Sequence, residues 1–396
     1  MNVIKLKAVF DYLLASIFVG VILGVCGAFA AQGFRSGIVF ISNHLGSFFS
    51  DDPNFFFYFA TLTLALIFVH YSRVAINGRP FESVADSIYL AHKANNETNV
   101  KVGFVSTIAA FFSASGGASI GQYGPLVHFG ATISSFIRRQ KYIPKIPHDI
   151  IIGSGVAAAI SAGFGAPLAG IIFAHETVLR HFSMKAVAAL AISSMAANYS
   201  ATEIGIVSPP LLLSAVPFEM SDILISLAII GPFAAIVAIF FMKLILFLGS
   251  IPAKIKIKSW QAPVIAGFAC GLLGMIFSDV LGLGTEVLMS VIKTQQVLGY
   301  LFALLIGKLI LTSICIGFGF FGGMFSPALF LGGVLGALIF QLPLTSANPD
   351  LLSVLAVSGM AAVSSSVIGA PITAIILVLE LTSSYEYAIA ATFPIV

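Results

Sequence analysis

The sequence predicts an all-α integral membrane protein, and three observations carry this prediction. Hydrophobic residues make up 59% of the 396 residues and charged residues only 9%, whereas a soluble domain carries about 25% charged residues. The apolar runs are long and free of charge, for example residues 223–242 and 309–338. Strands of a membrane barrel would instead alternate apolar and polar residues, so these runs indicate spanning helices.

The first apolar run follows Lys5 and Lys7 and extends to about residue 48 without a convincing cleavage site. We interpret it as a first spanning helix and not as a removed signal peptide. The three cysteines, Cys26, Cys270 and Cys315, lie inside apolar runs and are expected to be packing residues. No Cys/His cluster indicates a metal site, and a net charge of +3 is too small to indicate nucleic acid.

The chain contains an internal repeat. "SGVAAAISAGFGAPLAGIIFAHE" (residues 154–176) matches "SGMAAVSSSVIGAPITAIILVLE" (residues 358–380) at an offset of about 204. A second match, at an offset of about 202, pairs Gly121, Pro125 and Gly130 with Gly323, Pro327 and Gly332. We therefore predict two homologous halves, residues 1–210 and 211–396, that together form one transmembrane domain.

The charges of the loops predict that the two halves are inverted. Basic clusters at Lys5 and Lys7, residues 138–145 and residues 254–258 are assigned to the cytoplasm. The acidic or neutral loops 50–54 and 208–222 are assigned to the outside. The first half then begins inside and ends outside, so the second half runs upside down. Inverted repeats are typical of transporters and channels, with the substrate site near the midplane.

Four stretches break the apolar pattern with Gly, Pro and polar residues: 76–83, 121–125, 322–327 and 382–387. Broken helices persist in hydrocarbon only where they are buried in protein or line a hydrated cavity. In the second and third stretches, Pro lies near a first helical turn, so free N–H groups and the positive dipole end face a ligand. This pattern predicts an anion site built without a full positive charge. Ordinary structural kinks are the alternative.

These motifs resemble those of the CLC chloride channels and chloride/proton antiporters over nearly the whole chain. "GQYGP" falls where the family has G-[KR]-E-G-P, "GGMFSP" fits G-x-F-x-P, and "INGRP" lies where many members have G-S-G-I-P. "GAPLAG", "GAPITA" and "SSYEY" fit further stretches in the same order. The resemblance implies a homodimer with one anion path per subunit, and many tilted, partly reentrant helices. We expect a prokaryotic-type member without regulatory nucleotide-binding domains.

Carried over by position, the resemblance implies an anion site with contributions from three segments. Tyr385 would donate its hydroxyl to the central anion, and Asn77, beside Gly78, would replace the inner filter serine with a side-chain amide. Arg79 would strengthen the positive potential of the inner vestibule or act as a cytoplasmic snorkelling residue. Backbone amides of Met324, Phe325, Gly121, Gln122, Tyr123 and Gly124 would complete the site.

Two departures from the family pattern concern proton chemistry. The gating glutamate of the family falls at Tyr123, and a phenol with a pKa of about 10 cannot carry the proton near neutral pH. The inner proton-transfer glutamate of many antiporters falls at Thr177. Glu176 precedes it by one residue, about 100° around an α-helix, and with His175 it forms a possible substitute proton path.

Other titratable groups receive structural interpretations from the sequence. We expect His128 to be a hydrogen-bonded packing residue, with pH sensing as the alternative. Glu82 and Asp86 are expected in a solvated polar segment on the inner side.

The predicted function is passive chloride transport without proton coupling, in a cell membrane, with Tyr123 as gate or plug of the path. The alternatives are a chloride/proton antiporter that uses His175 and Glu176, and a membrane sensor that binds anions without flux. A fluoride-specific member is disfavoured because the gating glutamate is missing. We expect no enzyme activity, no cofactor and no metal. The expected partners are chloride or a similar monovalent anion, membrane lipid and a second copy of the chain, but no nucleic acid.

Overall fold

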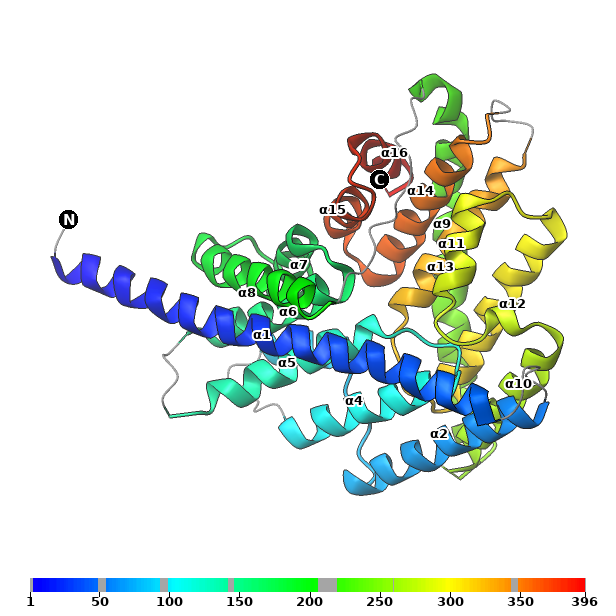
Figure 1. The fold of residues 1–396 in the computed structure, drawn as a ribbon, viewed down its shortest axis with the longest axis horizontal. Coiled ribbons are helices and arrows are strands. Elements are labelled where there is room, and N and C mark those ends of the chain that lie inside the picture. Colours follow the sequence, from blue (N-terminus) through cyan, green and yellow to red (C-terminus); the bar gives the residue numbers. More distant parts are fainter. Residues whose placement is uncertain are drawn as a thin grey trace. The chain divides into compact units, whose positions relative to one another are not determined.

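The computed structural model describes residues 3–48, 55–92, 99–141, 146–205, 219–258, 260–342 and 348–395. Helices make up most of this part of the chain (Figure 1), which confirms the all-α prediction. The α-helices of the first half are α1 (Val3–Phe48), α2 (Phe55–Ala75), α3 (Val84–His92), α4 (Val100–Ser115), α5 (Tyr123–Arg138), α6 (His148–Phe164), α7 (Pro167–Phe173) and α8 (Met184–Glu203). A π-helix, η1 (Ala174–Leu179), follows α7 directly.

The later helices are α9 (Met220–Lys254), α10 (Gln261–Ile276), α11 (Thr285–Lys293), α12 (Leu298–Gly317), α13 (Phe325–Phe340), α14 (Leu351–Ile368), α15 (Pro371–Thr382) and α16 (Tyr385–Ile395). A short 3₁₀ turn, η2 (Ser278–Val280), precedes α11. The chain forms two compact units. Unit 1 comprises Met1–Arg35, Arg79–Thr107 and Tyr123–Pro210, and unit 2 comprises Ser36–Gly78, Ile108–Gln122 and Leu211–Val396.

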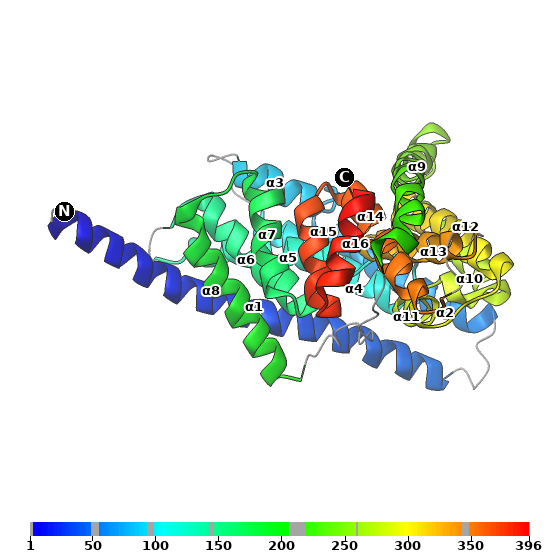
Figure 2. The same ribbon diagram turned by 90° about the horizontal axis from the view of Figure 1, so that it is seen from above.

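In unit 1, helix α6 lies at the centre and packs against α5, α7 and α8. Figures 1 and 2 both show α6 beside α7 and α8. Helices α5 and α6 cross at glycine on glycine. A Cβ added to Gly130 would lie 2.3 Å from the carbonyl oxygen of Gly155. Because that neighbour is backbone, no side-chain movement would relieve the overlap. Small residues permit this close approach.

In unit 2, helices α13 and α14 pack in the same manner. A Cβ added to Gly332 would lie 2.2 Å from the carbonyl oxygen of Gly359. Gly332 and Gly359 are the repeat partners of Gly130 and Gly155 in the aligned sequence. The repeated glycines therefore make the same helix–helix contact in each unit.

The repeated "GAP" motif also has one local structure in both copies. Gly165 ends α6 and Gly369 ends α14, each in the left-handed region, with φ of 68° and 75°. Glycine adopts this conformation without the steric penalty that a Cβ brings. A proline then occupies the first position of α7 and of α15, where its missing N–H removes no helical hydrogen bond.

Four helical segments of the described residues are long and apolar enough to cross a membrane: Phe10–Ile41, Ser221–Lys254, Leu298–Gly317 and Leu351–Ile368. Shorter apolar helices include α4, α6, α10, α13 and α15. Loop 50–54 and residues 208–218 of the second predicted outer loop lie outside the described residues.

Candidate functional site

The two glycine motifs of the repeat meet in unit 2 as an antiparallel bridge. The Gly121 N–H donates to the Gly323 carbonyl at 2.8 Å, and the Gly323 N–H donates to the Gly121 carbonyl at 2.7 Å. A Cβ at Gly121 would lie 2.8 Å from that same carbonyl and 2.9 Å from the Ser326 hydroxyl oxygen. The close approach explains glycine at this position. The bridge holds together two motifs that are 202 residues apart in the sequence.

Helix α13 begins at this bridge without a side-chain cap. Met324 is its N-cap residue and Phe325 its first residue, and the N-cap makes no side-chain capping hydrogen bond. Two buried polar atoms of unit 2 near the motifs have no hydrogen-bond partner, the Gln122 Oε1 and the Ser326 Oγ. The Ser326 hydroxyl can donate to a dehydrated anion, as backbone N–H groups at a helix start can, whereas the Gln122 Oε1 is an acceptor and needs a donor. Sequence reasoning missed Ser326, although it stands inside the GGMFSP motif.

A buried lysine in unit 2 also escaped the sequence analysis. Lys308 lies on α12 with no exposed surface. Its Nζ donates to the carbonyls of Gly282 at 2.7 Å and Val280 at 3.2 Å, and lies 5.2 Å from the ring centroid of Phe330. A lone basic residue inside an apolar segment was the available signal, because ionisable groups within a membrane are costly and usually functional.

The loop that holds Lys308 is tied to the segment leading into the bridge. The Gly282 N–H donates to the Gly117 carbonyl at 3.0 Å, and the Ser119 hydroxyl donates to the Val280 carbonyl at 2.9 Å. The lysine and the bridge are thus linked by two short hydrogen-bonded segments. A cationic amine placed there would add a positive potential near the segment that leads into the bridge.

Tyr123, the predicted gate, begins α5 in unit 1. Its ring stacks on Phe164 with ring centroids 3.7 Å apart and an interplanar angle of 18°. A Cβ at Gly163 would lie 3.3 Å from the same ring. The phenol therefore packs against the C-terminal end of α6, and Gly124 follows it in the first turn of α5.

The remaining predicted anion contacts are less closely associated with the bridge. Asn77 and Gly78 lie in the turn that follows α2, both in left-handed conformations, with φ of 55° and 72°. Asparagine tolerates this conformation better than most residues. Tyr385 begins α16 with 73% of its surface exposed, whereas Tyr387 is buried. Among the described contacts, neither Asn77 nor Tyr385 hydrogen-bonds to Gly121 or Gly323.

The possible proton path lies in η1 of unit 1. His175 is 1% exposed; its Nδ1 is 3.2 Å from the His181 carbonyl, its ring stacks on Phe182, and its Nε2 is buried without a partner. The Thr177 hydroxyl donates to the Phe173 carbonyl at 2.6 Å.

The sequence-based angle of 100° between Glu176 and Thr177 assumed an α-helix. The structure has a wider π turn instead. Such turns occur frequently at functional sites.

A family model described as voltage gated chloride channel matches residues 60–396. The H(+)/Cl(-) exchange transporter ClcA of Klebsiella pneumoniae (strain 342) is 30% identical over 297 residues, which cover 71% of this chain and 62% of that protein. The ClcA transporter of Yersinia pestis bv. Antiqua (strain Angola) is 29% identical over 299 residues, covering 71% and 61%. The matched region spans less than two thirds of these relatives.

Solved structures share the fold. A CLC-type fluoride/proton antiporter has a TM-score of 0.80 at 21% identity and covers 100% of this chain and 95% of that one. A slow cyanobacterial Cl⁻/H⁺ antiporter has a TM-score of 0.79 at 20% identity and covers 97% and 92%. At these identities the likeness establishes the fold, so the predicted CLC-type architecture is confirmed.

The prediction of passive, uncoupled transport is wrong by the same comparisons. The curated relatives are named H(+)/Cl(-) exchange transporters, and two of the similar structures are described as antiporters. The sequence-based inference relied on two missing carboxylates, at Tyr123 and Thr177. Other titratable groups can bind a proton, so the loss of carboxylates at two motif positions does not by itself remove proton coupling.

Proposed function

This chain belongs to the voltage-gated chloride channel family, and we propose that it exchanges chloride for protons across a cell membrane. The single observation that carries the anion part is the Gly121–Gly323 bridge, which joins the two glycine motifs in front of the uncapped start of α13. The names of the curated relatives support the proton part. We expect the active form to be a homodimer with a separate path in each subunit.

The anion is bound by neutral donors with a cation nearby. Backbone N–H groups of the first turn of α13, with the Ser326 hydroxyl, provide the contacts, and Lys308 provides positive potential without direct contact. Dipoles attract a monovalent anion while allowing its release, which transport requires. Tyr385 and Asn77 remain predicted contacts.

The proton requires a route that does not depend on Tyr123. His175 is the group in η1 suited to this role, because its imidazole is buried and its Nε2 has no hydrogen-bond partner. Glu176, half-buried and adjacent, would deliver or accept the proton.

Simultaneous chloride and proton flux in proteoliposomes tests the exchange. A chloride gradient should drive proton movement in the opposite direction with a fixed ratio of protons to chloride. Chloride flux without proton movement would refute exchange, and calorimetric chloride binding without any flux would indicate a sensor.

The residues of η1 are tested with the double variant His175→Gln/Glu176→Gln. Proton movement per chloride should fall strongly, while the same changes at exposed positions, His92→Gln and Glu203→Gln, should leave the ratio unchanged. An unchanged ratio in the double variant would remove η1 from the proton path.

A further inference from the structure

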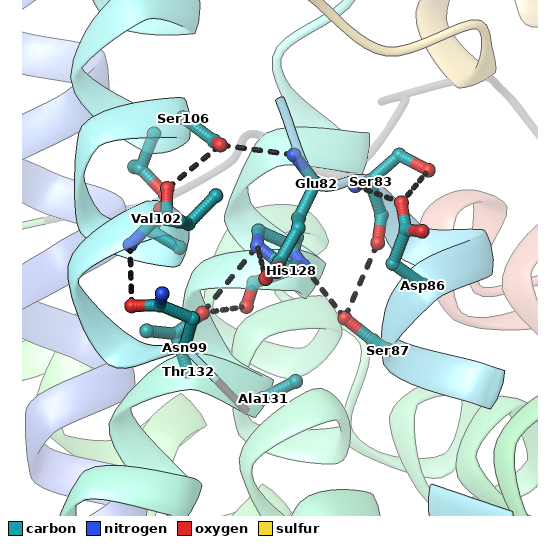
Figure 3. Close-up of polar contacts among 12 residues, drawn as sticks. Glu82, Ser83, Asp86, Ser87, Asn99, Val102, Ser106, His128, Ala131 and Thr132 are labelled. Atoms are coloured by element: carbon teal, nitrogen blue, oxygen red, sulfur yellow. Dashed lines mark hydrogen bonds and ion pairs between the residues drawn. The ribbon is translucent and has the colours of Figure 1, made fainter. Parts of the chain in front are cut away.

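Unit 1 contains a second cluster of titratable groups, which the proposed function has not yet used. It lies where the loop before α3, helix α3 and helix α5 meet (Figure 3). Its central groups are Glu82, Ser87 and His128. The sequence analysis placed Glu82 in a solvated segment, but its side chain is only 22% exposed and faces His128.

His128 is held on both ring nitrogens. It is 1% exposed, and its Nδ1 lies 2.7 Å from the Ser87 hydroxyl. Its Nε2 lies 3.5 Å from the Thr132 hydroxyl oxygen and 3.9 Å from the Glu82 Oε2. Since the Thr132 hydroxyl donates to the His128 carbonyl at 2.9 Å, its oxygen faces Nε2 as an acceptor. The ring is thus placed so that a proton on Nε2 points to oxygen atoms.

Glu82 is held in place but is not fully hydrogen-bonded. Its N–H donates to the Ser106 hydroxyl at 3.0 Å, and that hydroxyl donates to the Val102 carbonyl at 2.8 Å. Its Oε2 is buried and has no hydrogen bond. A carboxylate oxygen without a donor is costly to bury, so a proton on this carboxyl or on the facing imidazole removes the cost.

Burial lowers the pKa of the His128 imidazole to about 4, although nearby Asp86 raises it, so the Glu82 carboxyl is the favoured proton site of the pair. Burial raises the pKa of the Glu82 carboxyl, and nearby Asp86 raises it further, whereas Arg79 acts in the opposite direction. Asp86 on α3 accepts from the Ser83 N–H at 2.7 Å and from its hydroxyl at 3.0 Å. An extra proton would therefore be stabilised by the negative charge of Asp86.

The other elements packed against α3 and α5 bring two further sets of groups. Helix α6 carries Asp149 and also His148, whose Nδ1 lies 2.7 Å from Arg138, ten residues along α5 from His128. On another side, η1 packs against α3 and carries His175 and Glu176. Helix α3 therefore contacts both the element of His128 and the element of His175.

We propose that Glu82 and His128 form a proton-binding pair of this exchanger, on the same proton path as His175. The pair takes up one proton from water, shares it between the Glu82 carboxyl and the His128 Nε2, and passes it on toward η1 along α3. No bond other than those to the proton changes. This inference rests on the proposed chloride/proton exchange and names the groups that replace the missing carboxylates.

The test is the ratio of proton to chloride flux in proteoliposomes for Glu82→Gln and His128→Gln. Each should lower chloride-driven proton movement relative to chloride flux by about two orders of magnitude, as expected for the loss of a positioned proton-transfer group. Glu82→Asp retains a carboxyl and should restore much of the ratio. The matched controls His92→Gln, at an exposed position on α3, and Glu203→Gln should keep the wild-type ratio.

The outcomes separate the two proposals. Wild-type protein that moves chloride without protons would refute the exchange itself. Wild-type coupling together with a wild-type ratio in Glu82→Gln and His128→Gln would overturn the proton-binding pair and leave the exchange intact.

Ser87→Ala covers the case in which those variants fail to fold, because it removes only the hydroxyl at Nδ1. It should shift the pH dependence of coupled transport. An unchanged pH profile would contradict the pair.

Discussion

Tyr123 departs from the gating glutamate of the family motif, but uncoupled transport, the consequence that we predicted from this departure, is wrong. It occupies the position of a gating carboxylate in the resembled motif, and a phenol does not ionise near neutral pH. In the structure its ring is stacked on Phe164 and lies beside Gly163. The ring is therefore held by packing, and we propose that other residues of unit 1, His128 and His175, carry the proton chemistry.

Replacing Tyr123 tests whether this stacked ring limits the anion path. Tyr123→Ala removes the ring, and we expect chloride flux to rise several-fold because the residue next to the bridge segment becomes small. An aromatic stack contributes about 0.5–1.5 kcal/mol, so the variant should fold with a modest loss of stability. Flux measured in proteoliposomes and a thermal unfolding midpoint in detergent check the two effects.

Phe164→Leu is the matched control, since it removes the stacking partner and keeps the Tyr123 ring. A flux that rises equally in both variants would show that ring mobility limits transport. No rise in either variant would mean that the ring lies beside the path.

At the scale of elements, each copy of the sequence repeat forms one helix crossing at which glycine packs on glycine. Helices α5 and α6 meet at Gly130 and Gly155, and α13 and α14 meet at Gly332 and Gly359. For Gly130, Gly332 and Gly359 the nearest atom to an added Cβ is a carbonyl oxygen of the neighbouring helix, and for Gly155 it is the Ser134 hydroxyl oxygen of α5. The same residues thus set the spacing of the helices that follow both glycine motifs.

Gly130→Ala and Gly332→Ala should each destabilise the protein. A methyl group at 2.2–2.3 Å from a backbone oxygen forces the helices apart, at a cost of about 1–3 kcal/mol. Thermal unfolding midpoints in detergent should fall for both variants.

Gly33→Ala is the control for these two substitutions. Gly33 lies inside α1 with nothing within 4 Å of an added Cβ. Alanine there should leave stability unchanged or raise it by about 0.5–1 kcal/mol. Equal losses in all three variants would contradict the proposed role of the crossings.

At the scale of the molecule, the two compact units contain different chemistry. Unit 2 holds the Gly121–Gly323 bridge and the buried Lys308, which suit an anion. Unit 1 holds the Glu82–His128 pair and His175, which suit a proton. An exchanger must couple two such sets of groups in one transport cycle.

Coupling of this kind works in both directions. In proteoliposomes with equal chloride on both sides, an imposed proton gradient should drive net chloride movement against its own developing gradient. A chloride-selective electrode and a pH-sensitive dye would follow the two ions together. Chloride that stays at equilibrium under the proton gradient would contradict tight coupling.

The sequence by itself determined the class of protein, the repeat and the glycine motifs. The reason is that composition, helix-breaking residues and internal matches are local properties of the chain. It did not reveal that Lys308 and Ser326 lie near the candidate anion site, or that the Glu82 carboxyl lies opposite the His128 ring. Those depend on which atoms are buried together and which hydrogen bonds they lack. The π turn at His175 and the hydrogen bonds between Gly121 and Gly323 likewise appear only in three dimensions. An internal match at an offset of 202 residues pairs the two glycines in sequence but does not say that their backbones hydrogen-bond.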